Sequence, residues 1–273
     1  MDVRDGPILL VGCGKMGDAL LNGWLGRGVA PTNVVVIEPT AATGASARDR
    51  GVRVLGDLSA TEQNFVPRIV IFAVKPQVMA EVVPAYRRFV APATTFLSIA
   101  AGKPLAFFAA HLTPEASVVR AMPNTPAAIG RGITVLCAND AATAADRALA
   151  ETLMTAVGGV TWTADEGLMD AVTAVSGSGP AYVFYMIECL AAAGVAAGLP
   201  VALAERLARD TVEGAAALSR EDGSSPATLR QNVASPGGTT AAALSVLMGD
   251  HGLQDVMTRA VLAAAARSRE LAD

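Results

Sequence analysis

The chain has 273 residues, enough for two domains of ordinary size, and 52% of them are hydrophobic, which allows a large core. The net charge of −4 is mild and no Lys/Arg run occurs, so we expect no nucleic-acid partner. The charged segment Met1–Pro7 does not resemble a signal peptide. Three cysteines lie far apart without a disulfide or metal-binding pattern; we therefore expect reduced thiols, no metal and a cytoplasmic location.

In the first half of the chain, short apolar runs alternate with helical stretches such as Met16–Arg27. Continuously apolar runs of this length are typical of parallel strands that are covered on both faces. The alternation predicts an α/β domain with a doubly wound sheet over residues 1–164. The strands that we expect are Ile8–Val11, Val34–Ile37, Ile69–Val74, Thr95–Ile99, Val118–Arg120, Ile133–Cys137 and Val160–Thr163.

From about Asp165 the chain is Ala-rich, with helical periodicity and no convincing strand, which predicts an all-helical domain over residues 165–273. Its turn signals are Ser176–Pro180, Gly198–Pro200, Asp222–Pro226 and Ser235–Gly238. The apolar stretch Tyr182–Leu199 is long enough to suggest a membrane span, but Glu188 interrupts it, and a lone carboxylate is costly in lipid. We expect no membrane and instead a helix that is buried in a dimer, because a monomer would expose too much apolar surface.

A glycine-rich loop follows the first predicted strand and opens the first predicted helix. In this context the GxGxxG pattern indicates dinucleotide binding, because its glycines allow a tight turn, a close approach of the pyrophosphate and close helix packing. The helix N-terminus then offers free N–H groups to the phosphates. An ordinary strand-to-helix turn is the alternative. The residues expected to bind the cofactor here are Gly12, Cys13, Gly14, Lys15, Met16 and Gly17.

Glu38 ends the second predicted strand, about 20 residues beyond the glycine loop, where the dinucleotide-binding pattern has an acidic residue. A carboxylate there is expected to accept a hydrogen bond from the adenosine ribose of NAD and to repel the 2′-phosphate of NADP. Arg48 and Arg50 lie nearby and are able to receive a phosphate. The sequence therefore leaves NADPH or NADH open as the cofactor and favours NADH only slightly.

The chain carries five further motifs, namely Ala73-Val74-Lys75-Pro76, Ser98-Ile99-Ala100-Ala101-Gly102, Arg120-Ala121-Met122-Pro123-Asn124-Thr125-Pro126, Ser176-Gly177-Ser178-Gly179-Pro180-Ala181-Tyr182 and Ser235-Pro236-Gly237-Gly238-Thr239-Thr240. In order and spacing they resemble those of the pyrroline-5-carboxylate reductase family, from about residue 7 to the C-terminus. The last two motifs are quite specific to that family. The resemblance implies a Rossmann-type nucleotide-binding domain followed by an all-helical dimerisation domain, and a homodimer or higher homo-oligomer.

The resemblance also implies an activity, the reduction of 1-pyrroline-5-carboxylate to L-proline by hydride transfer from NAD(P)H, which is the last step of proline biosynthesis. It places further cofactor contacts at Ala73, Val74, Lys75, Pro76, Ala100, Ala101 and Asn232. All of these except Asn232 follow strand ends, where ligands gather in open α/β sheets. The family's substrate site falls on Glu166, Ser235, Gly237, Gly238, Thr239 and Thr240.

The segment Ser235–Thr240 also has a direct physical interpretation. Pro236 fixes its entry, two glycines free the backbone and a helix starts at Thr239 or Thr240, which makes a nest of N–H groups suited to a carboxylate. A helix N-cap without a ligand is the alternative. In the family, the hydroxyl at the Thr240 position reaches the ring nitrogen. Three positions depart from the family pattern and leave the outer substrate contacts open: Gly223, Gln231 and Met248.

The chain has three lysines, Lys15, Lys75 and Lys103, and none lies in the helical half. A 3-hydroxyacid dehydrogenase-like enzyme, which has a similar nucleotide domain, would place a catalytic lysine there. A protonated imine is already electrophilic, so its reduction needs mainly positioning and one donor, for which Thr240 is the catalytic candidate. Three alternatives stay open: a reductase of another cyclic imine, a 3-hydroxyacid dehydrogenase-like enzyme and a non-catalytic nucleotide-binding protein.

Overall fold

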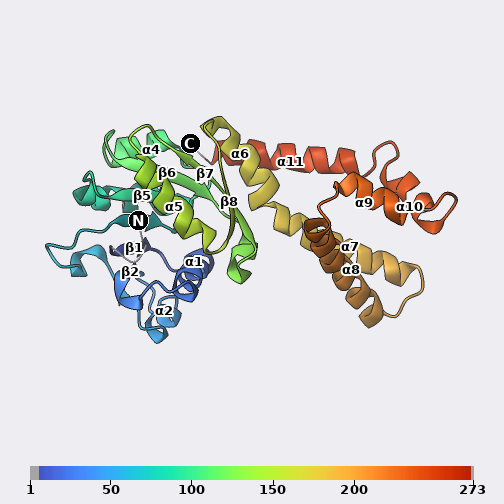
Figure 1. Ribbon diagram of the computed structural model, residues 1–273, viewed down its shortest axis with the longest axis horizontal. Coiled ribbons are helices and arrows are strands. Elements are labelled where there is room, and N and C mark those ends of the chain that lie inside the picture. The colour runs from blue at the N-terminus through green and yellow to red at the C-terminus, as the bar shows by residue number, and fades with distance from the viewer. Residues whose placement is uncertain (1–5, 272–273) are drawn as a thin grey trace. The chain divides into compact units, whose positions relative to one another are not determined.

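The computed structural model describes residues 6–271 (Figure 1). Residues 1–5, which make up most of the segment Met1–Pro7, and residues 272–273 lie outside the described residues. The chain divides into two compact units. Unit 1 extends to Gly177 and includes the chain again from Ala264, whereas unit 2 consists of Ser178–Ala263.

Unit 1 is built on a sheet whose described strands have the order β3-β2-β1-β4-β5-β6-β7-β8. All neighbouring strands are parallel except β6 and β7, which are antiparallel. The order 3-2-1-4-5-6 is that of a Rossmann-type sheet, in which the strand order reverses between β1 and β4. The strands are β1 (Ile8–Val11), β2 (Val34–Ile37), β3 (Arg53–Leu55), β4 (Ile69–Phe72), β5 (Thr95–Ser98), β6 (Ser117–Met122), β7 (Gly132–Ala138) and β8 (Gly158–Trp162).

Helices cover both faces of this sheet, as Figure 1 shows. On one face, α1 and α5 pack against Ile8 and Leu10 of β1. On the other face, α3 and α4 pack against Leu9 and Val11 of the same strand. Burial on both faces explains why this strand is continuously apolar. The helices of unit 1 are α1 (Lys15–Gly26), α2 (Ala45–Asp49), α3 (Met79–Val82), α4 (Leu105–His111), α5 (Ala144–Thr155) and α6 (Met169–Val172).

The expected fold class is confirmed, and every strand expected from the sequence is present. The strand β3 was not expected, because it has only three residues and Arg53 at its start is exposed. It forms nonetheless because it pairs with β2 at the edge of the sheet. The antiparallel pairing of β7 with β6 was not expected either; the chain returns after β6 through the short helix η6 (Thr125–Ile129) instead of a crossover helix.

The described residues of unit 2 form only helices. They are α7 (Gly179–Ala196), α8 (Val201–Glu221), α9 (Pro226–Val233), α10 (Thr239–Leu247) and the first part of α11 (Leu253–Glu270), whose last residues belong to unit 1. Three of the expected turns separate successive helices. At Ser176–Pro180, however, the chain does not turn as expected: the π-helix η8 (Thr173–Gly177) leads into α7, and Pro180 fits the first turn of α7, where no intrahelical N–H bond is lost.

Many apolar side chains of unit 2 are exposed in the single chain, and none of the residues of α7 is buried. One helical run among the described residues, Glu166–Ala196, is long and apolar enough to cross a membrane by length and composition alone. Helices of soluble proteins meet the same criterion, so this finding by itself says little about location. The apolar surface does require a covering partner of some kind.

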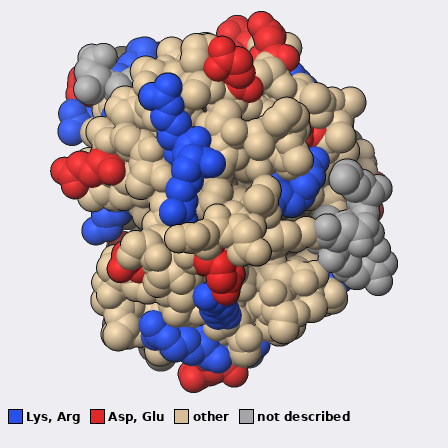
Figure 2. Space-filling model, turned by 90° about the vertical axis from the view of Figure 1, so that its left-hand side faces the viewer, with Lys and Arg blue, Asp and Glu red and all other residues tan. Residues whose placement is uncertain are grey.

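The surface of unit 1 carries charges of both signs. The face shown in Figure 2 presents Lys and Arg side chains as well as Asp and Glu side chains, with uncharged surface between them. Some of the charged side chains of unit 1 pair at the surface, for example Arg53 with Glu62. Exposed pairs of this kind contribute little to stability, typically below about 1 kcal/mol.

A buried carboxylate joins the amino ends of two strands to α5. Asp146 is 3% exposed, and its Oδ1 accepts hydrogen bonds from Arg68, just before β4, and from Thr95 at the start of β5. Its Oδ2 accepts from the backbone N–H and the hydroxyl of Thr143, the N-cap of α5. Burial disfavours the charge, but the hydrogen bonds outweigh burial and lower the pKa of Asp146 below its ordinary value.

Replacing Asp146 by asparagine is expected to destabilise the fold by about 2 kcal/mol, because the amide group would face a donor where the carboxylate accepts. The folded pKa is below the unfolded value, so the carboxylate stabilises the wild type above about pH 4, and this stabilisation is lost as the pH falls through the folded pKa. Thermal melting of both proteins between about pH 3 and pH 7 measures the difference. The exposed Asp140→Asn is the control; equal melting curves for the Asp146→Asn protein and this control would contradict the assignment.

Candidate functional site

The glycine loop between β1 and α1 runs against the loop that follows β4. Gly12 has a φ of +90°, and a Cβ on it would lie 2.9 Å from the carbonyl oxygen of Ala73 and 2.8 Å from Cγ1 of Val74. A Cβ on Gly17 would collide with the carbonyl oxygen of Gly12. Glycine is therefore required at both positions, and the loop is held where the strand order reverses between β1 and β4.

The N-terminus of α1 is open. Gly14 is its N-cap residue, no side chain caps the helix, and a Cβ on Gly14 would meet no atom within 4 Å. The N–H groups of the first turn, which begins with Lys15 and Met16, are thus available to an anion. A bare helix N-terminus behind a glycine turn fits the pyrophosphate of a dinucleotide.

The segments after β4 and β5 share this edge of the sheet. The N–H of Ala73 donates to the carbonyl of Val11 at 2.8 Å, and the N–H of Ile99 donates to that of Phe72 at 3.1 Å. These bonds continue the strand pairing and place further expected cofactor contacts at the same edge of the sheet as the glycine loop. They are Ala73, Val74, Lys75 and Pro76, which lead into the short helix η4 (Pro76–Val78), together with Ala100 and Ala101.

Glu38 ties the end of β2 to the glycine loop. Its side chain is buried, and Oε2 accepts a hydrogen bond from the N–H of Cys13 at 3.0 Å. Oε1 accepts from the N–H of Thr40 at 2.9 Å. The thiol of Cys13 lies inside the core, where burial and the charge of Asp18 raise its pKa to about 11, so it is neutral near pH 7.

Glu166 lies in the short helix η7 (Glu166–Leu168) of unit 1. Its Oε1 accepts hydrogen bonds from the guanidinium of Arg120 and from the N–H of Leu105 at 2.7 Å. Leu105 is the first residue of α4, so the carboxylate also favours that helix N-terminus. Asp170, four residues beyond Glu166, accepts a hydrogen bond from the hydroxyl of Ser268 in α11 at 2.6 Å.

Arg120 was not among the expected site residues. It is 8% exposed, lies on β6 and pairs with Glu166. A lone arginine at the end of an apolar strand, at the start of the Arg120–Pro126 motif, was the available signal, because a buried guanidinium requires an acidic partner.

The segment Ser235–Thr240 of unit 2 forms a tight turn that opens α10. The N–H of Gly238 donates to the carbonyl of Ser235 at 3.0 Å, Pro236 is at the second position and Gly237 is at the third, with φ of +69°. This is the pattern of a type II turn. Gly238 is the N-cap of α10 and offers no side chain, so no side-chain cap occupies the N–H groups at the start of α10, which begins with Thr239 and Thr240.

The expected site residues thus fall in two sets. Unit 1 brings together the glycine loop, Glu38 and the segments after β4 and β5, and it also contains Glu166. Unit 2 contains the turn Ser235–Gly238 with α10, and it contains Asn232, which is exposed on α9. Among the described residues, no cluster of side chains suits a metal ion.

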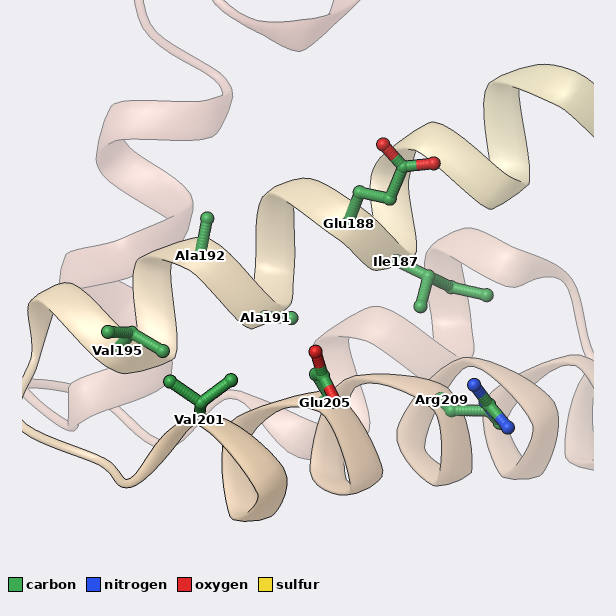
Figure 3. Close-up of a pocket in the computed structure, with 8 residues that line it drawn as sticks. All are labelled: Ile187, Glu188, Ala191, Ala192, Val195, Val201, Glu205 and Arg209. Atoms are coloured by element: carbon green, nitrogen blue, oxygen red, sulfur yellow. The ribbon is translucent and has the colours of Figure 1, made fainter.

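A groove of about 480 Å³ runs between α7 and α8 in unit 2, and sequence patterns gave no indication of it (Figure 3). Its walls are mainly apolar, but they include two carboxylates and one guanidinium. The lining residues are Ile187, Glu188, Ala191, Ala192, Val195, Val201, Glu205 and Arg209. The groove belongs to the unit whose apolar surface is exposed in the single chain.

Comparisons with known proteins match two stretches of the chain to family models. Residues 166–271 match the family model described as pyrroline-5-carboxylate reductase dimerisation, and residues 7–102 match that described as NADP oxidoreductase coenzyme F420-dependent. The pyrroline-5-carboxylate reductase of Synechocystis sp. is 41% identical over 264 residues, which cover 96% of this chain and 97% of that protein.

Solved structures of pyrroline-5-carboxylate reductases are also similar to this chain over nearly its whole length. A pyrroline-5-carboxylate reductase from Coxiella burnetii has a TM-score of 0.91 at 33% identity and covers 98% of this chain and 99% of its own. The pyrroline carboxylate reductase of Plasmodium falciparum, solved with NADP bound, has a TM-score of 0.84 at 26% identity and covers 99% of both chains. Since the identity with such relatives extends over nearly the whole length, this chain belongs to the pyrroline-5-carboxylate reductase family.

Proposed function

We propose that this chain reduces 1-pyrroline-5-carboxylate to L-proline by hydride transfer from NAD(P)H, the last step of proline biosynthesis. The observation that carries the proposal is a pair of open helix N-termini, each behind a glycine turn. One opens α1 on a Rossmann-type sheet, and the other opens α10 in the helical unit. They suit the two anionic groups of this reaction, the pyrophosphate of the cofactor and the carboxylate of the substrate.

NAD(P)H supplies the hydride, and unit 1 binds it. The residues Gly12–Gly17 hold the pyrophosphate through backbone N–H groups, and Glu38 accepts from the adenosine ribose. The segments Ala73–Pro76 and Ala100–Ala101 bind the nicotinamide half, and Asn232 is a further cofactor contact that the family resemblance implies. The steric requirement for glycine at Gly12, and the open space at Gly14, support this assignment.

Residues 165–273 are proposed as the substrate and dimerisation domain. The N–H groups of Gly238, Thr239 and Thr240 hold the substrate carboxylate, and Ser235 and Gly237 shape the turn that presents them. The pair of Glu166 with Arg120 supports the pocket by fixing η7 against β6 and α4. The family model that begins at residue 166 agrees with this start of the domain.

The proposed reaction needs few catalytic side chains. The hydroxyl of Thr240 orients the imine nitrogen or passes it a proton, and hydride addition to the C=N carbon then needs positioning more than acid–base catalysis. The two histidines are not needed: His111 stacks on Phe107 and contacts its carbonyl group, and His251 is exposed in a turn. A mechanism that needs a single hydroxyl donor distinguishes imine reduction from hydroxyacid oxidation, which would require a catalytic lysine in the helical half.

Purified protein tests the proposal directly. On addition of 1-pyrroline-5-carboxylate it should oxidise NADH or NADPH, followed as loss of the reduced-nicotinamide absorbance, and form L-proline. The six-membered homologue of the substrate should give a lower kcat/KM. Absence of turnover with either cofactor would refute the proposal, and a higher kcat/KM for the larger ring would redirect it to another cyclic imine.

We further propose that the chain is a cytoplasmic homodimer or higher homo-oligomer, which involves neither nucleic acid nor a membrane. Exposed Phe184, Tyr185 and Leu190 on α7 favour a protein partner, and the matched dimerisation model favours a second copy. Light scattering should therefore give at least twice the chain's mass of 27.7 kDa. A monodisperse monomer at working concentration would contradict this prediction.

A further inference from the structure

We propose that Glu38 makes this chain an NADH-preferring enzyme and does so as a fixed carboxylate that belongs to the glycine loop itself. The inference rests on the proposed cofactor site and goes beyond it, because the proposed function leaves the choice between NADH and NADPH open. The inference concerns the adenosine end of the cofactor. That end takes no part in the hydride transfer.

The carboxylate of Glu38 is held in place from two sides. The residue is 7% exposed, and each of its oxygens accepts one backbone N–H, from Cys13 and from Thr40. The backbone N–H of Glu38 also donates to the carbonyl of Leu55 on β3 at 2.9 Å. The side chain therefore cannot swing away to admit another anion without breaking bonds that shape the glycine loop.

The carboxylate also lies where the adenosine ribose binds in this fold, at the end of β2 beside the glycine loop. Each carboxylate oxygen accepts two hydrogen bonds, so each retains one free position after the backbone contacts. A ribose 2′-hydroxyl can donate into such a position. A 2′-phosphate would instead bring a second anion against a charge that is unable to move.

The nearby cations do not offset this charge. Arg50 donates to the carboxylate of Asp18, to the side-chain oxygen of Asn22 and to Ser46, so its guanidinium is already paired. Arg48 is exposed, and its Nη1 donates to the carbonyl of Ala41 at 3.0 Å. Of these two arginines, Arg48 alone lacks an acidic partner, and it is therefore the group that a competing NADPH mode would use.

Direct binding measurements test the proposal without turnover. The Kd of NADH, from nicotinamide fluorescence or calorimetry, should be at least about tenfold lower than that of NADPH. Glu38→Gln removes the charge and keeps the size, so the ratio of the two Kd values should fall toward one. Part of that change should come from weaker NADH binding, because one of the backbone N–H groups would face the amide nitrogen. Glu115→Gln, the same change at an exposed site before β6, should leave both Kd values unchanged.

Arg48→Ala examines the competing NADPH mode. The Kd of NADH and that of NADPH should each change by less than about twofold, since Arg48 takes no part in NADH binding. Equal or tighter binding of NADPH by the wild type would overturn the proposal, even if Glu38→Gln fails to fold. A wild type that prefers NADH yet does not reduce 1-pyrroline-5-carboxylate would refute the proposed function and leave this inference intact.

Discussion

Alanine in place of Gly12 is expected to weaken NAD(P)H binding by about 100-fold and to destabilise unit 1 by about 3 kcal/mol. Two causes act together. The φ of +90° is strained for any residue with a side chain, and the added Cβ would lie 2.9 Å from the carbonyl oxygen of Ala73 and 2.8 Å from Cγ1 of Val74. Relief of that contact moves the glycine loop away from the loop after β4, and the cofactor needs both loops.

Two other glycines separate these causes. Gly28 has nearly the same φ, +89°, but a Cβ on it would meet nothing within 4 Å. Gly28→Ala should therefore carry only the backbone strain, about 1–2 kcal/mol, with cofactor binding unchanged. Gly14→Ala should fold normally, because its φ of −65° suits alanine and no protein atom is near. It should still bind NADH at least about tenfold more weakly, because the methyl group fills the space for the pyrophosphate.

Chemical denaturation and NADH titration of the three variants provide the readouts. A Gly12→Ala protein as stable as Gly28→Ala, with unchanged affinity, would show that the loops are not coupled. Unchanged affinity in Gly14→Ala would show that the open N-terminus of α1 is not the pyrophosphate site. Gly26→Ala, within α1 and equally free of neighbours, is the control for adding a methyl group to that helix.

Local patterns were enough to predict the glycine loop and its setting. The strand, the turn and the start of α1 all lie within one short stretch of the chain. The turn Ser235–Gly238 and the helix starting at Thr239 were predictable for the same reason. Proline at the second position and glycine at the third specify the turn with no help from distant residues.

Contacts between distant residues were not predictable. The pairs Arg120 with Glu166 and Arg68 with Asp146 are 46 and 78 residues apart in sequence, and only the strand order brings them together. The bond from Cys13 to Glu38 is of the same kind: the spacing predicted an acidic residue at the ribose, but not that the residue also supports the glycine loop. The π-helix before α7 was missed because its Ser and Gly residues are also those of a turn.

Removal of the Thr240 hydroxyl is expected to lower kcat by about 100-fold, because the hydroxyl is the donor proposed for the imine nitrogen. Alanine suits the first turn of α10, so the N–H groups that hold the substrate carboxylate stay in place, and neither the KM for the imine nor the Kd of NADH should change by more than a few-fold. Thr240→Ser keeps a hydroxyl and should retain most of the rate.

Thr152→Ala, which removes an exposed hydroxyl on α5 that bonds only within its own helix, is the control. If Thr240→Ala keeps wild-type kcat, the donor lies elsewhere; if serine is as slow as alanine, the methyl group matters and not the hydroxyl.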